Sequence, residues 1–264
     1  MPYSLLLGGL AALLFTLPLA WKWELGLRRV GFSVAGLAVL AGVIAALVGA
    51  DGLLGGALVF VLAVGTAVAI LAWRFYRDPE REIRAGEQAI VSPADGEIIY
   101  VRHSRGGVVP VSTKHGRDYR LDELTRTDLD SGNAVVIGIA MSFLDVHVNR
   151  TPIAGRVTLQ QHFPGLFGSL KDPEMMLRNE RATTVIEGGG LQVAMVQIAS
   201  RLVRQIVSYV SAGEVVVKGQ RFGVIRLGSQ VDLVLPDRPD LEVRVAPGDR
   251  VRAGETVVAL ASRP

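Results

Sequence analysis

Three long apolar segments fill the first 73 residues, and they constrain the fold more than any other feature of this 264-residue chain. A helix of about 20 mainly apolar residues can cross a bilayer. The apolar runs therefore predict transmembrane helices over about 3–21, 30–50 and 53–73, within a membrane anchor of residues 1–77. Between Tyr3 and Trp73 the charged residues are Lys22, Glu24, Arg28, Arg29 and Asp51.

Two alternatives to three crossings follow from the same segments. The first segment could be a secretory signal peptide, but it has no basic n-region and no small-residue cleavage site before Trp21. We therefore expect it to be an anchor. The second and third segments could form a re-entrant hairpin that turns at Asp51-Gly52, and this alternative stays open.

The basic residues beside the spans predict the orientation. Positively charged residues gather on the cytoplasmic side of membrane helices. After three crossings both basic clusters lie on one side, so we expect the following domain on the cytoplasmic side of the cell (inner or plasma) membrane. Basic residues next to a span also attract anionic lipids. The two clusters are Lys22, Arg28 and Arg29, and Arg74, Arg77, Arg81 and Arg84.

The net charge of +3 indicates no particular kind of partner, whereas the absence of cysteine excludes two kinds of site. Without cysteine the chain forms no disulfide and no thiolate metal site. No segment resembles a nucleic-acid-binding module, so we expect no nucleic-acid partner.

Residues 78–264 have a β pattern after a charged surface linker, "RDPEREIRAGEQ". Short runs such as "AIVSPADGEIIYVR", "NAVVIGIA", "TTVIEG" and "LEVRV" are separated by turn residues. The polar segment 103–132 predicts a long hairpin or loop insertion, and "GLFGSLKDPEMMLRNER" a loop with a helical turn. The segment "VAPGDRVRAGETVVAL" looks like the strand–turn–strand unit of biotinyl- and lipoyl-carrier domains. We therefore expect a mainly β (α+β) domain with biotinyl/lipoyl-like elements after the transmembrane helices.

The stretch "RFGVIRLGSQVDLVLP" (221–236) predicts a half-buried strand with an interruption. Val231, Leu233 and Leu235 alternate on one face and Asp232 lies on the other. Gly228-Ser229 breaks the middle of this run, where glycine marks a bulge or a close backbone approach. A serine can be a nucleophile when a histidine takes its proton. Its target could be the preceding carbonyl, because glycine tolerates strained backbone geometry.

Three other stretches carry groups that could do chemistry. Asp95 in "SPADG" lies at a turn, where the ordinary role of aspartate is to bind backbone N–H groups. His147 in "FLDVHVNRTP" follows an apolar run, but a lone histidine is more often structural. Asn179-Glu180-Arg181 alone would be interpreted as solvated surface.

Six pieces in order decide between these interpretations: "FYRDPER", "SPADG", "FLDVHVNRTP", "HFPG", "NER" and "GQRFGVIRLGSQVDLVLP". Together they resemble the phosphatidylserine decarboxylase proenzymes of the shorter bacterial and archaeal type. The resemblance implies self-cleavage between Gly228 and Ser229 into a large chain (1–228) and a small chain (229–264). It implies that Ser229 becomes a pyruvoyl group, a covalent cofactor used without metal or pyridoxal phosphate. Through a Schiff base with this group, phosphatidylserine would become phosphatidylethanolamine and CO₂.

The resemblance also implies roles for individual residues. His147 would be the base for self-cleavage, with Asp95 as its orienting partner. His162, Asn179 and Arg181 would bind substrate. Phosphatidylserine and anionic membrane lipids would be the partners. Because members of the family are often dimeric, the resemblance also predicts a homodimer.

One position departs from the longer bacterial members, which carry a second histidine three residues after the match to His147. Here that position is Arg150. His147 then serves both self-cleavage and decarboxylation, or His162 contributes.

The loop 162–181 is expected to admit the lipid. It carries the apolar runs "FPGLFGSL" and "MML". Arg178 and Arg181 could meet the lipid phosphate or the substrate carboxylate, because guanidinium binds such groups in a bidentate manner. The alternative is an ordinary surface loop whose arginines pair with Glu174 or Glu180.

Three other functions would each explain part of the sequence. A biotinyl or lipoyl carrier would need a lysine at the hairpin tip, and "VAPGD" has none. A zinc endopeptidase would need H-x-H ligands, which the four scattered histidines do not supply. An archaetidylserine decarboxylase differs only in the lipid tails, and this alternative stays open.

Overall fold

The computed structural model describes residues 2–23, 25–109, 119–127, 129, 133–166, 168, 170, 173–199, 205–226 and 229–261. The chain divides into two compact units, residues 1–77 and 78–264. Each unit is described by itself below.

The described part of the first unit consists of three helices, α1 (Pro2–Lys22), α2 (Leu27–Leu47) and α3 (Gly52–Tyr76). Each is long and apolar enough to cross a membrane. The three predicted apolar helices are therefore confirmed, with α3 extending three residues beyond the predicted end.

The three helices pack through small residues. A Cβ atom added to Gly8 of α1 would lie 2.3 Å from the Gly56 carbonyl oxygen of α3, so the two backbones approach closely. Large apolar side chains such as Leu14, Phe32 and Leu47 are 75%, 80% and 81% exposed. Small residues inside and large ones outside are typical of helices surrounded by lipid. The buried cluster is Ala12, Val34, Ala38, Ala41, Ala45, Val59 and Ala63.

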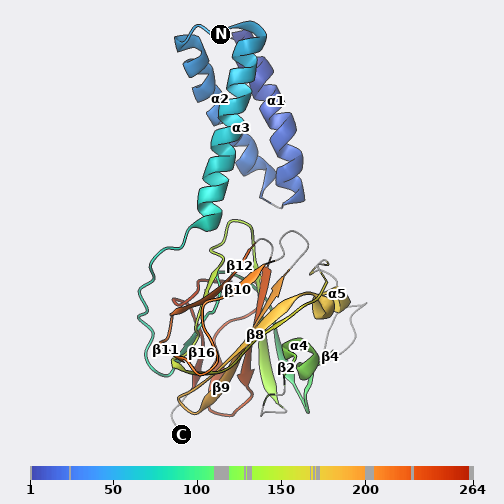
Figure 1. The fold of residues 1–264 in the computed structure, drawn as a ribbon, viewed down its shortest axis with the longest axis vertical. Helices are drawn as coiled ribbons and strands as arrows, with labels where there is room; N and C mark the ends of the chain where they lie inside the picture. The colour runs from blue at the N-terminus through green and yellow to red at the C-terminus, as the bar shows by residue number, and fades with distance from the viewer. Residues whose placement is uncertain are drawn as a thin grey trace. The chain divides into compact units, whose positions relative to one another are not determined.

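The second unit is mainly β, as predicted (Figure 1). Its described residues form a curled eight-stranded antiparallel sheet. In sheet order the strands are β11 (Val215–Val216), β7 (Gly155–Phe163), β8 (Arg181–Gly188), β9 (Leu191–Ala199), β13 (Ser229–Pro236), β5 (Ala134–Met141), β2 (Gly96–Ser104) and β15 (Arg250–Val251).

Smaller elements complete the described part of this unit. One small sheet consists of β1 (Ala89–Val91), β16 (Val257–Ala261) and β14 (Leu241–Val243). A second consists of β10 (Ile206–Ser208), β12 (Arg221–Ile225) and β6 (Val148–Arg150). The remaining elements are β3 (Val108–Val109), β4 (Tyr119–Arg120), α4 (Leu121–Thr125) and α5 (Pro173–Arg178).

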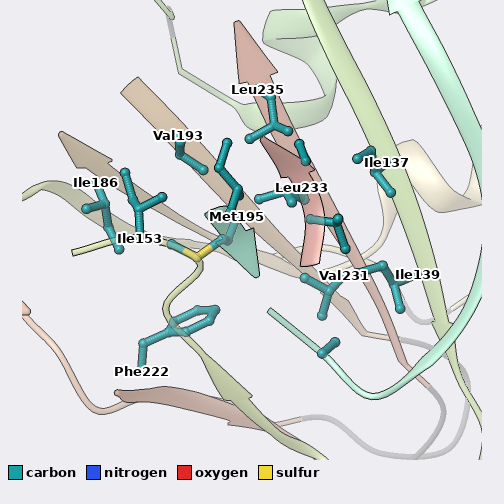
Figure 2. Close-up of a cluster of buried hydrophobic side chains, with 14 of the residues drawn as sticks. Ile137, Ile139, Ile153, Ile186, Val193, Met195, Phe222, Val231, Leu233 and Leu235 are labelled. Atoms are coloured by element: carbon teal, nitrogen blue, oxygen red, sulfur yellow. The ribbon is translucent and has the colours of Figure 1, made fainter. Parts of the chain in front are cut away.

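Both faces of the large sheet are covered. Figure 2 shows Val231, Leu233 and Leu235 of β13 packed among side chains of β5 and β9, with Phe222 of the second small sheet beside Met195. On the opposite face Val234 belongs to a cluster with side chains of α4 and α5. The prediction of a half-buried strand is therefore wrong, because Asp232 on this second face is fully buried.

The stretch 221–236 is also not one interrupted strand. β12 pairs with β6 and β10 in the small sheet, whereas β13 lies between β9 and β5 in the large one. Ser229 is the first residue of β13, and Gly228 lies outside the described residues. The crossing between the two sheets thus falls between Ile225, the last residue of β12, and Ser229.

Parts of the two predicted loop segments form helices and strands. The helical turn expected near "MML" is confirmed as α5. Residues 110–118 of the predicted polar insertion lie outside the described residues, and its described parts contain β3, β4 and α4.

The linker after α3 packs on the β unit instead of being purely solvated. The Arg221 Nε atom donates to the Asp78 carboxylate at 2.6 Å, and Arg150 donates to the Pro79 carbonyl at 3.1 Å. The side chain of Arg81 is 7% exposed. The stretch contains no helix or strand and most of its residues are exposed, so the predicted surface linker is confirmed. Its charged residues also find partners on the domain.

Candidate active site

Ser229 lies where three neighbouring strands of the large sheet begin or end. Its register partners are Met141, the last residue of β5, and Ala199, the last residue of β9. The backbone of Ser229 is described, whereas its side chain is not. The position is thus fixed from both sides by a continuous ladder.

The other predicted site residues lie at the same end of the sheet, because antiparallel strands alternate in direction. Asp95 immediately precedes β2, and His147 follows the end of β5 by six residues. His162 is the second-last residue of β7, and Asn179 lies two residues before β8. Five separate sequence motifs therefore meet at one end of the sheet.

His147 has a geometry suited to a base. It is 1% exposed, and its Nδ1 atom lies 2.9 Å from the Asp145 carbonyl oxygen. A carbonyl accepts but does not donate, so this contact assigns the proton to Nδ1. In the neutral ring Nε2 is then the nitrogen that can take up a proton.

The carboxylate of Asp95 is bound by partners other than His147. Its two carboxylate oxygens accept from Arg81 Nη2 at 2.8 and 3.0 Å, and Oδ1 accepts from the Ala253 backbone N–H at 2.8 Å. Arg81 also pairs with Glu255 at 3.2 Å. The role of Asp95 in orienting His147 stays a prediction, since the Asp145 carbonyl is the partner found at Nδ1.

Asn179 connects the "NER" motif to the strand beside Ser229. Its Nδ2 atom donates to the Ala199 carbonyl at 3.0 Å and to the Gly168 carbonyl at 3.1 Å. Its Oδ1 atom accepts from the Gly168 N–H at 2.7 Å. Asn179 is 2% exposed. Through these hydrogen bonds it joins the loop before α5 to Ala199, the register partner of Ser229 on β9.

Arg181 is 1% exposed, and its guanidinium donates to backbone carbonyls. The shortest bonds reach Leu124 of α4 at 2.6 Å and Met176 of α5 at 2.8 Å. Further bonds reach Asn179 at 3.3 Å and Glu123 at 3.2 Å. This environment is that of a structural residue, and a contact with lipid stays a prediction that would require these bonds to break.

His162 is more accessible than His147. Its side chain is 46% exposed, and its Nε2 atom lies 3.0 Å from Glu180 Oε1. It therefore lies at the rim of the site, where its predicted substrate role remains untested.

Comparison with known proteins agrees with this arrangement. The sequence model of the family described as Phosphatidylserine decarboxylase matches residues 68–259, which is most of the chain and includes every residue of the candidate active site. The chain belongs to the phosphatidylserine decarboxylase family.

Individual relatives carry the same name. The phosphatidylserine decarboxylase proenzyme of Symbiobacterium thermophilum is 38% identical over 197 residues, which cover 74% of this chain and 81% of the relative. That of Pelobacter propionicus is 41% identical over 185 residues, 70% of this chain and 74% of the relative. A proenzyme of Methanothermobacter thermautotrophicus, provisionally named archaetidylserine decarboxylase, is 39% identical over 194 residues, 74% and 82% of the two chains.

In this member of the decarboxylase family, the arginine at the second-histidine position is structural. Arg150 is 5% exposed and donates to the Gly219 carbonyl at 2.8 Å and the Pro79 carbonyl at 3.1 Å. It lies 3.5 Å from Asp78. Arg150 thus fastens the linker to β6 and is no substitute for an imidazole.

Sequence reasoning missed a polar network on β13 of this family member. Gln230 donates to Asp232 Oδ1 and to the Tyr100 hydroxyl, both at 2.7 Å, and that hydroxyl donates to Asp232 Oδ2 at 2.8 Å. Burial raises the pKa of Asp232 to about 6. The signal available was the pair Gln230 and Asp232, two polar residues on one face of an otherwise mainly apolar strand.

The site fits a group formed at residue 229 of the decarboxylase. A cut before Ser229 removes no rung of β13, whose pairs run from Ser229 to Pro236 with β5 and from Ser229 to Val234 with β9. The small chain would therefore stay in place, and its new end would remain fixed between Met141 and Ala199. Among the described residues, no group of three or more His, Cys, Asp or Glu side chains could hold a metal ion.

Proposed function

We propose that this chain is a self-processing, membrane-bound decarboxylase that converts phosphatidylserine to phosphatidylethanolamine and CO₂ with a pyruvoyl group made from Ser229. The observation that carries the proposal is the place of Ser229. It is the first residue of a central strand, at the sheet end where the other motifs meet.

The first stage is cleavage of the precursor. The Ser229 hydroxyl attacks the Gly228 carbonyl carbon, His147 takes the hydroxyl proton through Nε2, and the C–N bond between the two residues breaks. An ester replaces the peptide bond. Loss of the α-proton then releases the Gly228 carboxylate and leaves dehydroalanine, which takes up water, releases ammonia and becomes the pyruvoyl group.

The second stage is turnover of the lipid. The pyruvoyl group supplies a ketone that binds the substrate amine and a carbonyl that accepts electrons as CO₂ leaves. His147, buried at the same end of the sheet, is suited to return a proton to the carbon that loses CO₂. The ladders on both sides of residue 229 keep the reacting end in one position, which favours a single geometry of attack.

The anchor helices would keep the substrate within reach. The basic residues beside the helices favour a domain on the cytoplasmic side and attract anionic lipids. The serine headgroup is common to phosphatidylserine and archaetidylserine, and relatives carry both names. Activity on both lipids in parallel micelle assays would show that the tails are not selected.

The experiment that tests the proposal replaces the nucleophile. Ser229→Ala should leave one uncut 264-residue chain without decarboxylase activity, whereas the wild type should show two chains, 1–228 and 229–264, by intact mass. Ser208→Ala is a matched control in β10, where the hydroxyl donates to the Val210 carbonyl at 3.0 Å, and it should be cut normally. Normal processing of Ser229→Ala would refute the proposal.

A further inference from the structure

Two buried amide side chains join the small sheet to the large one beside Ser229. Gln197 of β9 donates through Nε2 to Asn149 Oδ1 of β6 at 2.8 Å. Both residues are fully buried. Neither residue of this amide pair is among the predicted site residues, and the resemblance to the family assigns no role to either of them.

The amide pair lies over the start of β13. Asn149 Nδ2 is 3.8 Å from the sulfur of Met141, the partner of Ser229 on β5. Gln197 is the register partner of Val231 and lies two residues before Ala199, the partner of Ser229 on β9. The pair therefore reaches from one neighbouring strand to the other, on the sheet face that Val231 occupies.

The same segment brings His147 to this place. The His147 carbonyl accepts from the Ile225 N–H at 3.3 Å, which continues the ladder between β6 and β12. Residues two apart in an extended segment face the same side. His147 and Asn149 thus both face inward, and both are buried.

One atom of the pair lacks a donor. Gln197 Oε1 is buried and accepts no hydrogen bond within the part of the chain that the structure describes. A buried acceptor without a donor is unfavourable, and an apolar side chain of equal size would remove that cost. Gly223 of β12 leaves room for the amide, since a Cβ there would lie 3.1 Å from Nε2 and 3.4 Å from Oε1.

We propose that Gln197 accepts a hydrogen bond from the reacting group at residue 229, and that Asn149 positions Gln197 for this contact. The donor is the Ser229 hydroxyl in the precursor and the amine nitrogen of the lipid headgroup in the mature enzyme. The inference rests on the proposed function. It adds Gln197 as a group that orients the donor, in addition to His147 as the base.

The decisive variant is Gln197→Met, which keeps the side-chain length and removes both the Oε1 acceptor and the Nε2 donor. Chain cleavage after synthesis should slow at least tenfold, read as the uncut fraction over time on denaturing gels. The cleaved fraction should lose at least tenfold in kcat on phosphatidylserine in mixed micelles, with KM within about threefold. The melting midpoint should change little, because the unmet acceptor Gln197 Oε1 is gone while the buried Asn149 Oδ1 atom loses its donor.

Two further variants separate this role from packing. Gln197→Glu keeps an oxygen acceptor and should recover several-fold over Gln197→Met in both rates. Thr184→Val is the control: its buried Oγ1 also lacks a partner among the described residues, and its register partner is Met195, farther along β9. Both rates should stay within twofold of the wild type.

Three results would overturn the inference. They are wild-type rates in Gln197→Met, equal rates in the Met and Glu variants, and a loss of rate that follows a fall in the melting midpoint. If Gln197→Met slows only chain cleavage or only decarboxylation, the contact is supported for that stage and rejected for the other. The Ser229→Ala variant is assayed in parallel, and it tests the proposed function independently of the result for Gln197.

Discussion

The buried carboxyl group of Asp232 should make the stability of the β unit depend on pH. Asp232 is fully buried on the central strand β13. Its pKa is raised from 3.8 to about 6, first by burial, and hydrogen bonds from Gln230 and Tyr100 oppose this rise. Arg181 and Arg102 also lower the pKa through their charges.

The sign and size of the effect follow from linkage. Between pH 3.8 and 6 the folded chain holds a proton on Asp232 that the unfolded chain has released, so stability falls as the pH rises through this window. The difference between a pKa of 3.8 and one of about 6 corresponds to about 3 kcal/mol. Most of it, about 2 kcal/mol, should develop between pH 4 and pH 7.

The assay compares the wild type with Asp232→Asn, which cannot ionise. Full-length protein in detergent is melted at several pH values, and the strand signal in circular dichroism is followed. The midpoint of Asp232→Asn minus that of the wild type should rise by about 4–8 °C from pH 4 to pH 7, at about 2–4 °C per kcal/mol for a domain of this size.

The control is Asp240→Asn. The pKa of Asp240 is lowered by its hydrogen bond from Arg238, so Asp240 titrates below this range and its offset from the wild type should stay constant. A constant offset for Asp232→Asn as well would show that Asp232 does not change its charge between pH 4 and pH 7, and the reasoning would be wrong.

Two further predictions concern packing. Arg181→Met should lower the free energy of unfolding by about 3 kcal/mol or more, because buried carbonyls at Leu124 and Met176 lose a charged donor. Chemical denaturation measures this, and wild-type stability with weakened lipid affinity would instead place Arg181 on the substrate. Gly8→Leu should destabilise the helical unit by about 1–3 kcal/mol, since its Cβ would meet the Gly56 carbonyl at 2.3 Å. Gly36→Leu, whose Cβ meets nothing within 4 Å, is the control, and equal shifts in the helical melting curve would contradict the close packing.

Local properties of the chain were sufficient for much of this description. Hydropathy over about 20 residues identifies helices that can span a bilayer, because each segment interacts with lipid by itself. The alternation of apolar residues and turn residues indicated a mainly β domain. The motifs around Ser229, His147 and Asp95 indicated the family, because reactive groups must keep fixed residue types at fixed places in the chain.

Tertiary structure decided what surrounds these residues. The run 221–236 looks like one strand, yet its two halves pair in different sheets, and the partners of β13 come from residues 134–141 and 191–199. Only this distant pairing buries Asp232, places Gln197 opposite Val231 and surrounds Arg181 with carbonyls from α4 and α5. Burial and hydrogen-bond partners depend on residues far away in the sequence, so a polar side chain that looks solvated in the chain can be the most enclosed group in the fold.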